Sequence, residues 1–340
     1  MKALLALAIS ILAFSAVAAE LDRDLLKAIG NDRTRWIAHS RGAEARECFR
    51  IVDSDGMPVT NANIRCAFKV NAGASGLQDV YGVTDTNGLC MINGMCKAYM
   101  DYSVEKEGYY CSHGKVDYME TTRVPAVVDG KWQPYGETRT VVLRRIKNPY
   151  AVKVHAYEQC HRKIPVFGQW LSFDMEVSDW LAPYGNGVHN DVLLWFEKAG
   201  SGRVGDFAFT MDACFTNNPY AGFYCKPMDE SSDLKTDYCA DTNANYCTNY
   251  RFLIDAISKG SVKKMGLEND SYLVFRTRTR VDEDGKLVGA HYGKYSRGWR
   301  SDEKEMHFGA SCFNPVENDN SIEGDQILHR KIRNYKKRRR

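Results

Sequence analysis

The sequence lacks most of the short motifs by which enzymes are recognised. It contains no Gly-x-Ser-x-Gly turn for a nucleophilic serine, no phosphate-binding loop and no dinucleotide-binding glycine pattern. No two cysteines form a Cys-x-x-Cys pair, the usual element of a structural zinc site. Histidine is scarce, and the two in HAYEQCH, His155 and His161, are six residues apart, which matches no common zinc spacing. The sequence therefore predicts no metal and no cofactor.

Long apolar runs are also missing beyond the N-terminus. After residue 19 no segment approaches the ~18 unbroken apolar residues that a membrane span needs. Residues 1–19 combine a positive Lys2, an apolar stretch and small residues before Glu20, the pattern of a cleaved secretory signal peptide. The first cysteine is Cys48, so none lies at the cleavage point to carry a lipid anchor. We expect the mature protein to be secreted or periplasmic; the alternative is that residues 1–19 form a buried helix.

The chain has eleven cysteines. In the oxidising compartment of an exported protein they are expected to form disulfides rather than metal or catalytic sites. The six in the second half could pair in several ways, and the sequence alone does not choose among them. Short separations favour Cys214–Cys225 and Cys239–Cys247 there and Cys90–Cys96 in the first half, which leaves Cys160–Cys312 as a long bridge. An odd number leaves at least one thiol. Cys66 is the candidate, because it alternates with Ile64 and Phe68 and is expected to face a core, where a thiol is inert.

Alternation of apolar and polar residues begins at Cys48 and recurs along the chain. Phe49 and Ile51 alternate with Arg50, and further runs with a period of two include 64–70, 100–104, 138–145, 171–177, 192–196, 207–211 and 272–294. Asp-Gly and Asn-Gly pairs between these runs supply the positive φ angles of tight turns. With about 320 residues left after signal cleavage, the pattern predicts an all-β protein of two β-sandwich domains.

The expected organisation has five parts. Residues 1–19 are the signal peptide, and 20–46 form a short helix followed by a linker. Residues 47–147 form the first sandwich, and 148–316 form a second, antiparallel β domain with disulfide-stapled loops. Within the second domain, 217–250 is expected to be such a loop region and 252–259 a short helix. Residues 317–340 are expected to be a flexible basic tail.

The basic character of the chain is confined to that tail. Eight of the 46 Lys and Arg residues lie between Arg330 and Arg340, so the rest of the chain has 38 basic and 43 acidic residues. Each basic group near an anionic surface contributes ~1 kcal/mol. The tail is therefore expected to contact lipid headgroups, lipopolysaccharide or nucleic acid without sequence specificity; the alternative is a solvated end with no partner.

Two aspartates in the stretch VDSDGMPVTNA are spaced like the first ligands of a calcium-binding loop. Counting from Asp53, an EF-hand loop would need an oxygen ligand at Met57, a glycine at Pro58 and a glutamate at Ile64. None of the three is present. We therefore expect Asp53 and Asp55 to form a turn, with Gly56 in the left-handed conformation.

Three segments carry a resemblance to a known family. VDSDGMPVTNANI, GVTDTNG and YSVEKEGYY resemble carboxypeptidase regulatory-like domains, which are small transthyretin-like, or immunoglobulin-like, β-sandwiches. The resemblance covers about residues 47–145 and implies an accessory or adhesive module without catalytic residues of its own. This copy departs from the pattern by its five cysteines and by an insert at 71–79.

Two further resemblances bear on function. Intradiol dioxygenases also use a transthyretin-like sandwich and hold iron with Tyr and His, but residues 47–145 contain only His113, which argues against that site. In the second half, RTRTRVDEDGKLVGAHYGK and DWLAPYGNG resemble stretches of uncharacterised exported bacterial proteins, and no activity follows from that.

A row of arginines is the first candidate binding site. Arg276, Arg278 and Arg280 alternate before a hairpin turn expected at Asp284-Gly285. A two-residue turn would place them on one face, ~7 Å apart along the strand, opposite Gly293, His291 and Gly289. Guanidinium groups bind carboxylate, sulfate or phosphate, so Arg276, Arg278, Arg280 and His291 are expected to bind an acidic glycan or a cell-surface polymer. The alternative is a charged face whose arginines pair with acids of a neighbouring strand.

Acidic residues near tryptophans are the second candidate. Asp174, Glu176, Asp179 and Asp191 are close in sequence to Trp170, Trp180 and Trp195. Paired carboxylates beside aromatic rings are typical of glycoside hydrolysis. The same acids on the wet face of a strand are ordinary exposed residues, and we expect this. Trp170 and Trp180 are the candidate glycan-binding residues, since a binding surface makes fewer geometric demands than catalysis.

These features lead to two hypotheses. The first is an exported, non-catalytic binding or envelope-associated structural protein that recognises glycans, anionic cell-surface polymers or an envelope protein partner. The second is a glycan-active hydrolase that uses acidic residues of the second domain. Turnover abolished by Asp174→Asn or Asp191→Asn would favour the hydrolase.

Overall fold

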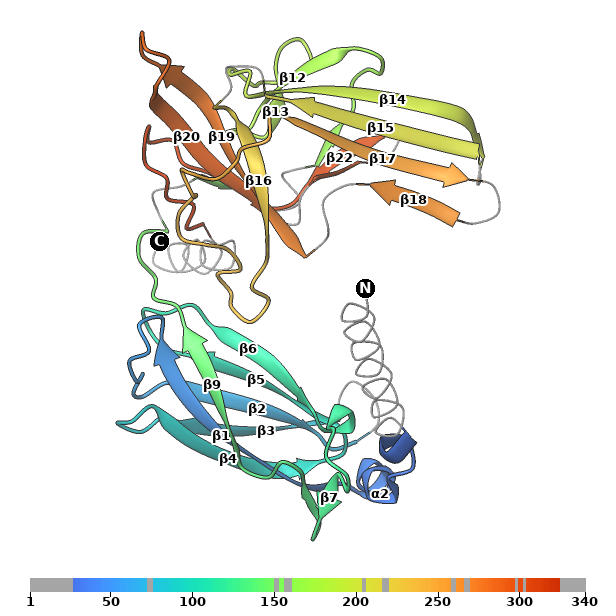
Figure 1. The fold of residues 1–340 in the computed structure, drawn as a ribbon, viewed down its shortest axis with the longest axis vertical. Helices are drawn as coiled ribbons and strands as arrows, with labels where there is room; N and C mark the ends of the chain where they lie inside the picture. Colours follow the sequence, from blue (N-terminus) through green and yellow to red (C-terminus); the bar gives the residue numbers. More distant parts are fainter. Residues whose placement is uncertain are drawn as a thin grey trace, which may run out of the picture. The chain divides into compact units, whose positions relative to one another are not determined.

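The computed structural model describes residues 27–71, 76–149, 153–155, 161–203, 206–215, 220–257, 261–265, 270–296, 299–301 and 304–324. The chain divides between Arg145 and Ile146 into two compact units, each built from β-sheets (Figure 1). The all-β prediction is confirmed. The expected signal peptide, Cys160 and the basic run Arg330–Arg340 lie outside the described residues. In the described part of the chain, no helix is long and apolar enough to cross a membrane.

The described residues of the first unit form two sheets. One has the order β4 (Leu89–Cys96), β1 (Ala43–Asp53), β8 (Lys131–Trp132), β7 (Val127–Val128), and β9 (Glu137–Leu143) pairs with β1 in parallel. The other has the order β3 (Leu77–Val83), β2 (Asn63–Lys69), β5 (Tyr99–Glu105), β6 (Ser112–Asp117). Their inner residues, among them Phe49, Ile64 and Phe68, form one core. Cys66 is buried in this core, as expected, and burial raises the pKa of its thiol to about 12.

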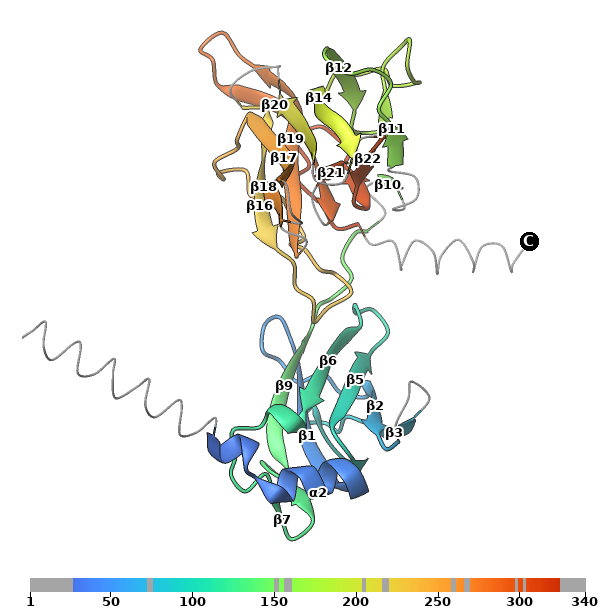
Figure 2. The ribbon, with the colours of Figure 1, turned by 90° about the vertical axis from the view of Figure 1, so that its right-hand side faces the viewer.

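The linker expected before the first sandwich is wrong, because residues 33–47 are part of the fold. Helix α2 (Arg33–Arg41) lies beside β7 at one end of the unit (Figure 2). Asp32 caps the helix by accepting from the Thr34 N–H at 3.0 Å, and it also accepts from the Ala126 N–H at 2.6 Å. Strand β1 then begins at Ala43, whose small side chain, with that of Ala45, is buried. Alanine has low β-propensity, so this start carries a weak sequence signal.

The turn at Asp53 is confirmed. The Asp53 carboxylate accepts from the N–H groups of Asp55 and Met57, both at 3.0 Å, and Gly56 has φ 79°. A carboxylate used in this way closes the turn without a cation. Within the same unit, the 3-10 helix η1 (Tyr118–Glu120) follows β6.

In the second unit, the part of the chain that the structure describes forms three antiparallel sheets. A six-stranded sheet has the order β13 (Asp179–Trp180), β12 (Trp170–Asp174), β14 (Val192–Arg203), β15 (Asp206–Cys214), β17 (Asn249–Ile257), β18 (Ser261–Met265). A five-stranded sheet has the order β10 (Lys153–His155), β23 (Ser311–Phe313), β20 (Leu287–Ser296), β19 (Ser271–Val281), β16 (Gly222–Pro227). A three-stranded sheet has the order β11 (His161–Lys163), β22 (Glu305–Phe308), β21 (Trp299–Ser301).

The core of this unit lies between the two larger sheets. Phe173, Phe196 and Phe209 from the six-stranded sheet belong to one buried cluster with Phe275 and Phe313 from the five-stranded sheet. A second buried cluster joins residues of β19 and β20 to the segment after β16 and to Ile322, which follows β23. Its members are Met228, Ala240, Tyr246, Tyr272, Val274, Ala290, Tyr292 and Ile322. The side of the six-stranded sheet that points away from Phe173, Phe196 and Phe209 is called the outer face below.

Three boundary predictions in the second unit are wrong. The expected helix 252–259 begins as strand, since Phe252–Ile257 is part of β17. The strand expected over 171–177 ends at Asp174, and residues 175–178 form a turn. The basic tail does not begin at 317. Glu323 is buried and accepts from the N–H groups of Lys147 at 2.8 Å and Asn148 at 2.7 Å, which makes residues up to 324 part of the folded unit.

The Cys90–Cys96 bridge is wrong. Both residues lie on β4, six positions apart, so their Cα atoms are ~20 Å from one another, far beyond the reach of a disulfide. The thiols of the other described candidates, Cys214, Cys225, Cys239, Cys247 and Cys312, are free.

The backbone favours a different partner for Cys247. The main chain of Cys247 pairs with that of Phe223 on β16, the strand that carries Cys225. The main chain of Cys239 pairs with that of Ser321 instead. Under oxidising refolding we therefore expect Cys247 to be linked to Cys225 rather than to Cys239. Non-reducing peptide mapping by mass spectrometry checks this, and a recovered Cys239–Cys247 peptide would contradict it.

Candidate functional site

The hairpin that carries the arginine row has a longer turn than expected. The Asp282 N–H donates to the Lys286 carbonyl at 2.9 Å, and the Asp282 carboxylate accepts from the Lys286 N–H at 2.8 Å. The turn therefore spans 282–286, with Gly285 at φ 76°. His291 pairs with Thr277 instead of Arg278, and the register shifts on both sides of Arg280. A bulge results, with Arg278 at φ 51°.

The bulge sends the three arginines to different places, so the expected strip does not form. Arg276 is buried, donates to the carbonyls of Tyr220 at 2.6 Å and Thr242 at 3.0 Å, and stacks 3.9 Å from the Tyr246 ring centroid. Arg280 is exposed and makes two hydrogen bonds, of 2.7 and 2.8 Å, to Glu317.

His291 lies against Phe313 and Asn314, at the end of β23. One ring nitrogen of His291 is 3.2 Å from the Asn314 carbonyl, and its ring stacks on Phe313 at 5.8 Å. Arg278 packs on the same phenyl ring, with its guanidinium carbon 4.7 Å from the centroid.

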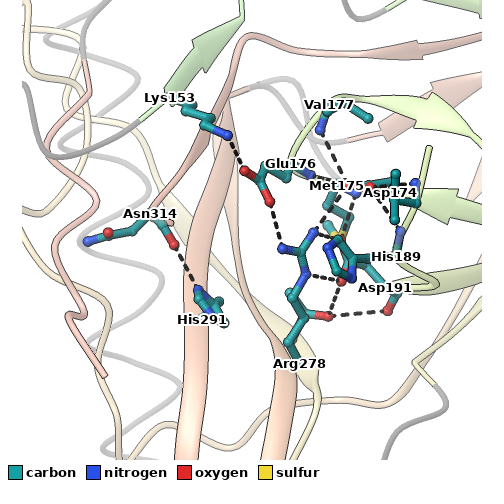
Figure 3. Close-up of polar contacts among 12 residues, drawn as sticks. Lys153, Asp174, Met175, Glu176, Val177, His189, Asp191, Arg278, His291 and Asn314 are labelled. Carbon is teal, nitrogen blue, oxygen red and sulfur yellow. Dashed lines mark hydrogen bonds and ion pairs between the residues drawn. The ribbon is translucent and has the colours of Figure 1, made fainter. Parts of the chain in front are cut away.

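Arg278 holds three acidic residues together, as Figure 3 shows. Its guanidinium makes two hydrogen bonds to Asp191, of 2.9 and 3.1 Å. The remaining contacts go to Glu176 at 2.6 Å and to Asp174 at 3.2 Å. Lys153 on β10 pairs with the other oxygen of Glu176. These five residues are called the Arg278 cluster, and they join β10, β12 and β19 to the loop before β14.

Main-chain N–H groups donate further hydrogen bonds to the carboxylates of Asp174 and Asp191. Asp174 accepts from four N–H groups, two in the turn after β12 and two in the loop before β14: Glu176, Val177, Val188 and His189. Asp191 accepts from the Met175 N–H at 2.9 Å and from the Thr277 hydroxyl at 3.0 Å. The expectation of exposed acids is wrong for these two, since Asp174 and Asp191 are each 1% exposed.

Burial and pairing act against one another on the pKa values of this cluster. Burial raises the pKa of Asp191, and the guanidinium of Arg278 opposes that rise only in part. Burial also acts to raise the pKa of Glu176, but hydrogen bonds from Lys153 and Arg278 outweigh it and hold this pKa below its ordinary value.

The two shifts predict opposite pH effects on stability. Because the pKa of Glu176 is lower in the folded state, its ionised form stabilises the fold above the unfolded pKa, and this contribution is lost in acid. The pKa of Asp191 is raised in the folded state, so the effect on stability has the opposite sign. As the pH rises through the acid range and Asp191 ionises, its contribution to the stability of the fold decreases. Relative to wild type, we expect the stability deficit of Glu176→Gln to shrink from about pH 7 to about pH 3 and that of Asp191→Asn to grow.

Urea unfolding across that pH range measures both deficits. Parallel pH profiles for the two variants would contradict the opposite pKa shifts.

The fourth acid stands apart from the cluster. Asp179 on β13 accepts from Arg162 at 3.1 Å and from the N–H groups of Trp180 and Asn186. No group of three or more His, Cys, Asp or Glu residues within the described ranges is arranged to hold a metal ion. The three clustered carboxylates meet at a guanidinium instead.

The two candidate tryptophans differ in exposure. Trp180 is 3% exposed, and its indole N–H donates to the Lys163 carbonyl at 2.9 Å, so it cannot receive a ligand. Trp170 is 48% exposed and lies directly opposite Trp195 on β14. The two indole rings are 5.6 Å apart, with their planes inclined by 59°.

The register extends this pair into a row across the outer face. Trp195 pairs with Asp212 on β15, and Asp212 pairs with Arg251 on β17. Directly opposed residues of antiparallel strands share a face. Arg251 holds Asp212 through two hydrogen bonds, of 2.6 and 2.7 Å. These four residues, Trp170, Trp195, Asp212 and Arg251, are called the tryptophan row, and their strands lie side by side in Figure 1.

A shallow hollow adjoins the tryptophan row. Its volume is about 440 Å³, and it is lined by residues of β14, β15 and the segment before β12: Phe167, Gly168, Glu197, Lys198, Ala199, Ala208 and Thr210. Glu197 and Thr210 are each two positions from members of the row and so lie on the same face. The next pair, Ala199 and Ala208, has small side chains, which leaves space at this point.

Sequence reasoning missed Asp212 and Arg251. Both alternate with buried residues, Asp212 between Met211 and Ala213 and Arg251 before Phe252. That alternation marks them as outward-facing, but only the strand order places them beside Trp195.

No protein-family model and no curated protein matches the sequence. Among solved structures, 3-chlorocatechol 1,2-dioxygenase from Rhodococcus Opacus 1CP is 10% identical, with a TM-score of 0.25 over 31% of this chain and 61% of that one. Catechol 1,2-dioxygenase from Acinetobacter sp. ADP1 is 14% identical, with a TM-score of 0.24 over 32% of this chain and 54% of that one. This chain thus spans 54% to 61% of the length of these structures. A likeness at this level carries no argument about activity.

Proposed function

We propose that the protein is an exported, non-catalytic binding protein of the cell envelope that recognises glycans. One observation carries the proposal, namely the pair of neighbouring tryptophans on the outer face, continued by the Asp212–Arg251 ion pair. Indole faces pack against the C–H faces of sugar rings, because the π-face is electron-rich. Beside them, the carboxylate and guanidinium offer acceptors and donors for hydroxyl groups. Two rigid rings next to a polar pair favour a sugar ligand over a purely apolar one.

The acidic residues do not favour the alternative of a hydrolase. A glycosidase needs two carboxyl groups ~5–9 Å apart on either side of an open site, with one free to give a proton. In the Arg278 cluster three carboxylates instead share one guanidinium, and those of Asp174 and Asp191 also accept main-chain N–H groups. Their geometry favours a structural role, in which the cluster fastens the turn after β12 to β19.

The first unit supports the binding role as an accessory module. We infer that residues 47–145 act as a carboxypeptidase regulatory-like domain, on the strength of the motif resemblance and of the two-sheet arrangement. This assignment adds no catalytic residues to the chain.

A glycan array run beside a panel of chromogenic glycosides tests the proposed function. We expect saturable binding to at least one glycan class and no turnover of any glycoside. Trp36→Ala is the matched control, since Trp36 is 54% exposed but belongs to the first unit. Turnover that is lost in Asp174→Asn or Asp191→Asn would replace the binding proposal by the hydrolase.

A further inference from the structure

We infer that the outer face binds a single, soluble, electrically neutral polysaccharide chain, laid along the tryptophan row from Trp170 to Arg251. The inference rests on the proposed glycan-binding function and adds the class of ligand. Three features carry it, namely the charge balance of the face, the angle between the indole rings and the direction of the row.

The described charges of this face leave no guanidinium free. The guanidinium of Arg251 is occupied on two sides by Asp212, and Glu197 adds a second carboxylate to the face, whereas its strand neighbour Lys198 points to the opposite side. Lys198 itself lies 4.7 Å over the Phe167 ring. Among the described side chains of this face, an acidic polymer would therefore find no unpaired guanidinium fork and would meet the carboxylate of Glu197. A neutral chain meets no such repulsion, since its hydroxyls donate to Asp212 and accept from Arg251.

The ring geometry excludes a flat ligand. Planes inclined by 59° cannot both lie against one crystalline polysaccharide surface, which presents coplanar sugar faces. A free chain can turn between one sugar and the next, so it can pack successive rings on Trp170 and Trp195. The exposed fraction of Trp170, 48%, leaves its face open to such packing.

The row gives the chain a direction. Four residues on adjacent strands cover three strand spacings, or ~14 Å across the sheet, the length of a short oligosaccharide. The chain would run across the strands, with its apolar contacts at the β12 and β14 end and its polar contacts at the β15 and β17 end. The hollow at Ala199 and Ala208 lies to one side of this path and has room for a branch or a further sugar.

Isothermal titration of the full-length protein against three classes of ligand tests the inference. The probes are a soluble neutral glucan, a soluble acidic polysaccharide such as polygalacturonate, and crystalline cellulose, the last measured by depletion. We expect binding to the neutral glucan with an affinity that changes less than about twofold between low and high salt, because no counterions are released. We expect at least tenfold weaker binding, or none, to the other two.

The outcomes separate the inference from the proposed function. Binding confined to the acidic or the crystalline probe would overturn the neutral-chain inference and leave glycan recognition standing. No binding to any of the three, or to the glycan array, would overturn the proposed function itself. Ala208→Phe fills the hollow without touching the row, so we expect it to weaken binding of a branched neutral chain while leaving a linear one within about twofold. Equal loss for both would place the linear chain in the hollow and contradict the path along the row.

Discussion

Replacing Arg278 by alanine is expected to lower the free energy of unfolding by about 3–5 kcal/mol. The guanidinium is the common partner of Asp174, Glu176 and Asp191, whose side chains are 0–15% exposed. Its removal leaves these carboxylates with main-chain donors, the Thr277 hydroxyl and a single cation, Lys153, among the described residues. Uncompensated buried charge is among the most destabilising single changes in a folded protein.

The same strand supplies a matched control. Arg280→Ala removes an arginine that also makes a two-pronged contact with one acid, but the Arg280 side chain is 63% exposed. An exposed pair contributes little to stability because water screens the charges, so we expect a much smaller loss than for Arg278→Ala. Urea unfolding of both variants measures the contrast. Equal effects of the two substitutions would show that Arg278 is not the partner on which the buried acids depend.

The second large effect is expected for binding. Trp195→Ala and Trp170→Ala are each expected to weaken glycan binding by at least tenfold, because both remove an apolar ring surface that the sugar covers. Neither change should unfold the protein, since Trp170 is 48% exposed and Trp195 is partly exposed. Titration with the glycan found on the array measures the loss, and circular dichroism checks the fold.

Trp180 provides the contrast for this prediction. It is 3% exposed and packs edge-on against Phe173 at 5.1 Å and Phe196 at 5.9 Å. Trp180→Ala is therefore expected to destabilise the fold by about 3–5 kcal/mol rather than to remove a ligand contact. A folded Trp195→Ala variant that binds as well as wild type would exclude the tryptophan row as the binding surface.

Much of the fold follows from local patterns in the sequence. Strict alternation predicted the strands around Phe173, Phe196 and Phe209, because each side chain on such a strand points to the face opposite its neighbour's. The turn at Asp53 was predictable for the same local reason, since a short acid followed by glycine closes a turn on its own main chain. Each of these features depends on residues that are close in the chain.

The candidate site was harder to predict because its contacts are long-range. Asp174 belongs to the polar positions of its run, yet it is buried, and its partner Arg278 is 104 residues away. The divergence of the three arginines depends on a bulge set by the length of the turn at 282–286. Asp284-Gly285 fits both a two-residue turn and this longer one, so the dipeptide alone does not determine the register.

The choice between tryptophans was also beyond local reasoning. Trp180 follows the turn at 175–178, where Ser178 has φ 52°, and the reversed chain points its indole into the core. Trp195 is placed beside Trp170 by strand pairing alone. The sequence made tryptophan a candidate residue type for glycan binding, and the sheet determines that Trp170 faces outward and Trp180 inward.

The most direct test of the account is a titration of the glycan into protein labelled with nitrogen-15 at its six tryptophans, followed by NMR of the indole N–H signals. The account predicts that the signals of Trp170 and Trp195 shift and saturate together. Those of Trp132 and Trp180, whose indoles donate to carbonyl groups inside their units, and of Trp36 should stay in place. Saturable binding that leaves the Trp170 and Trp195 signals unmoved would contradict it.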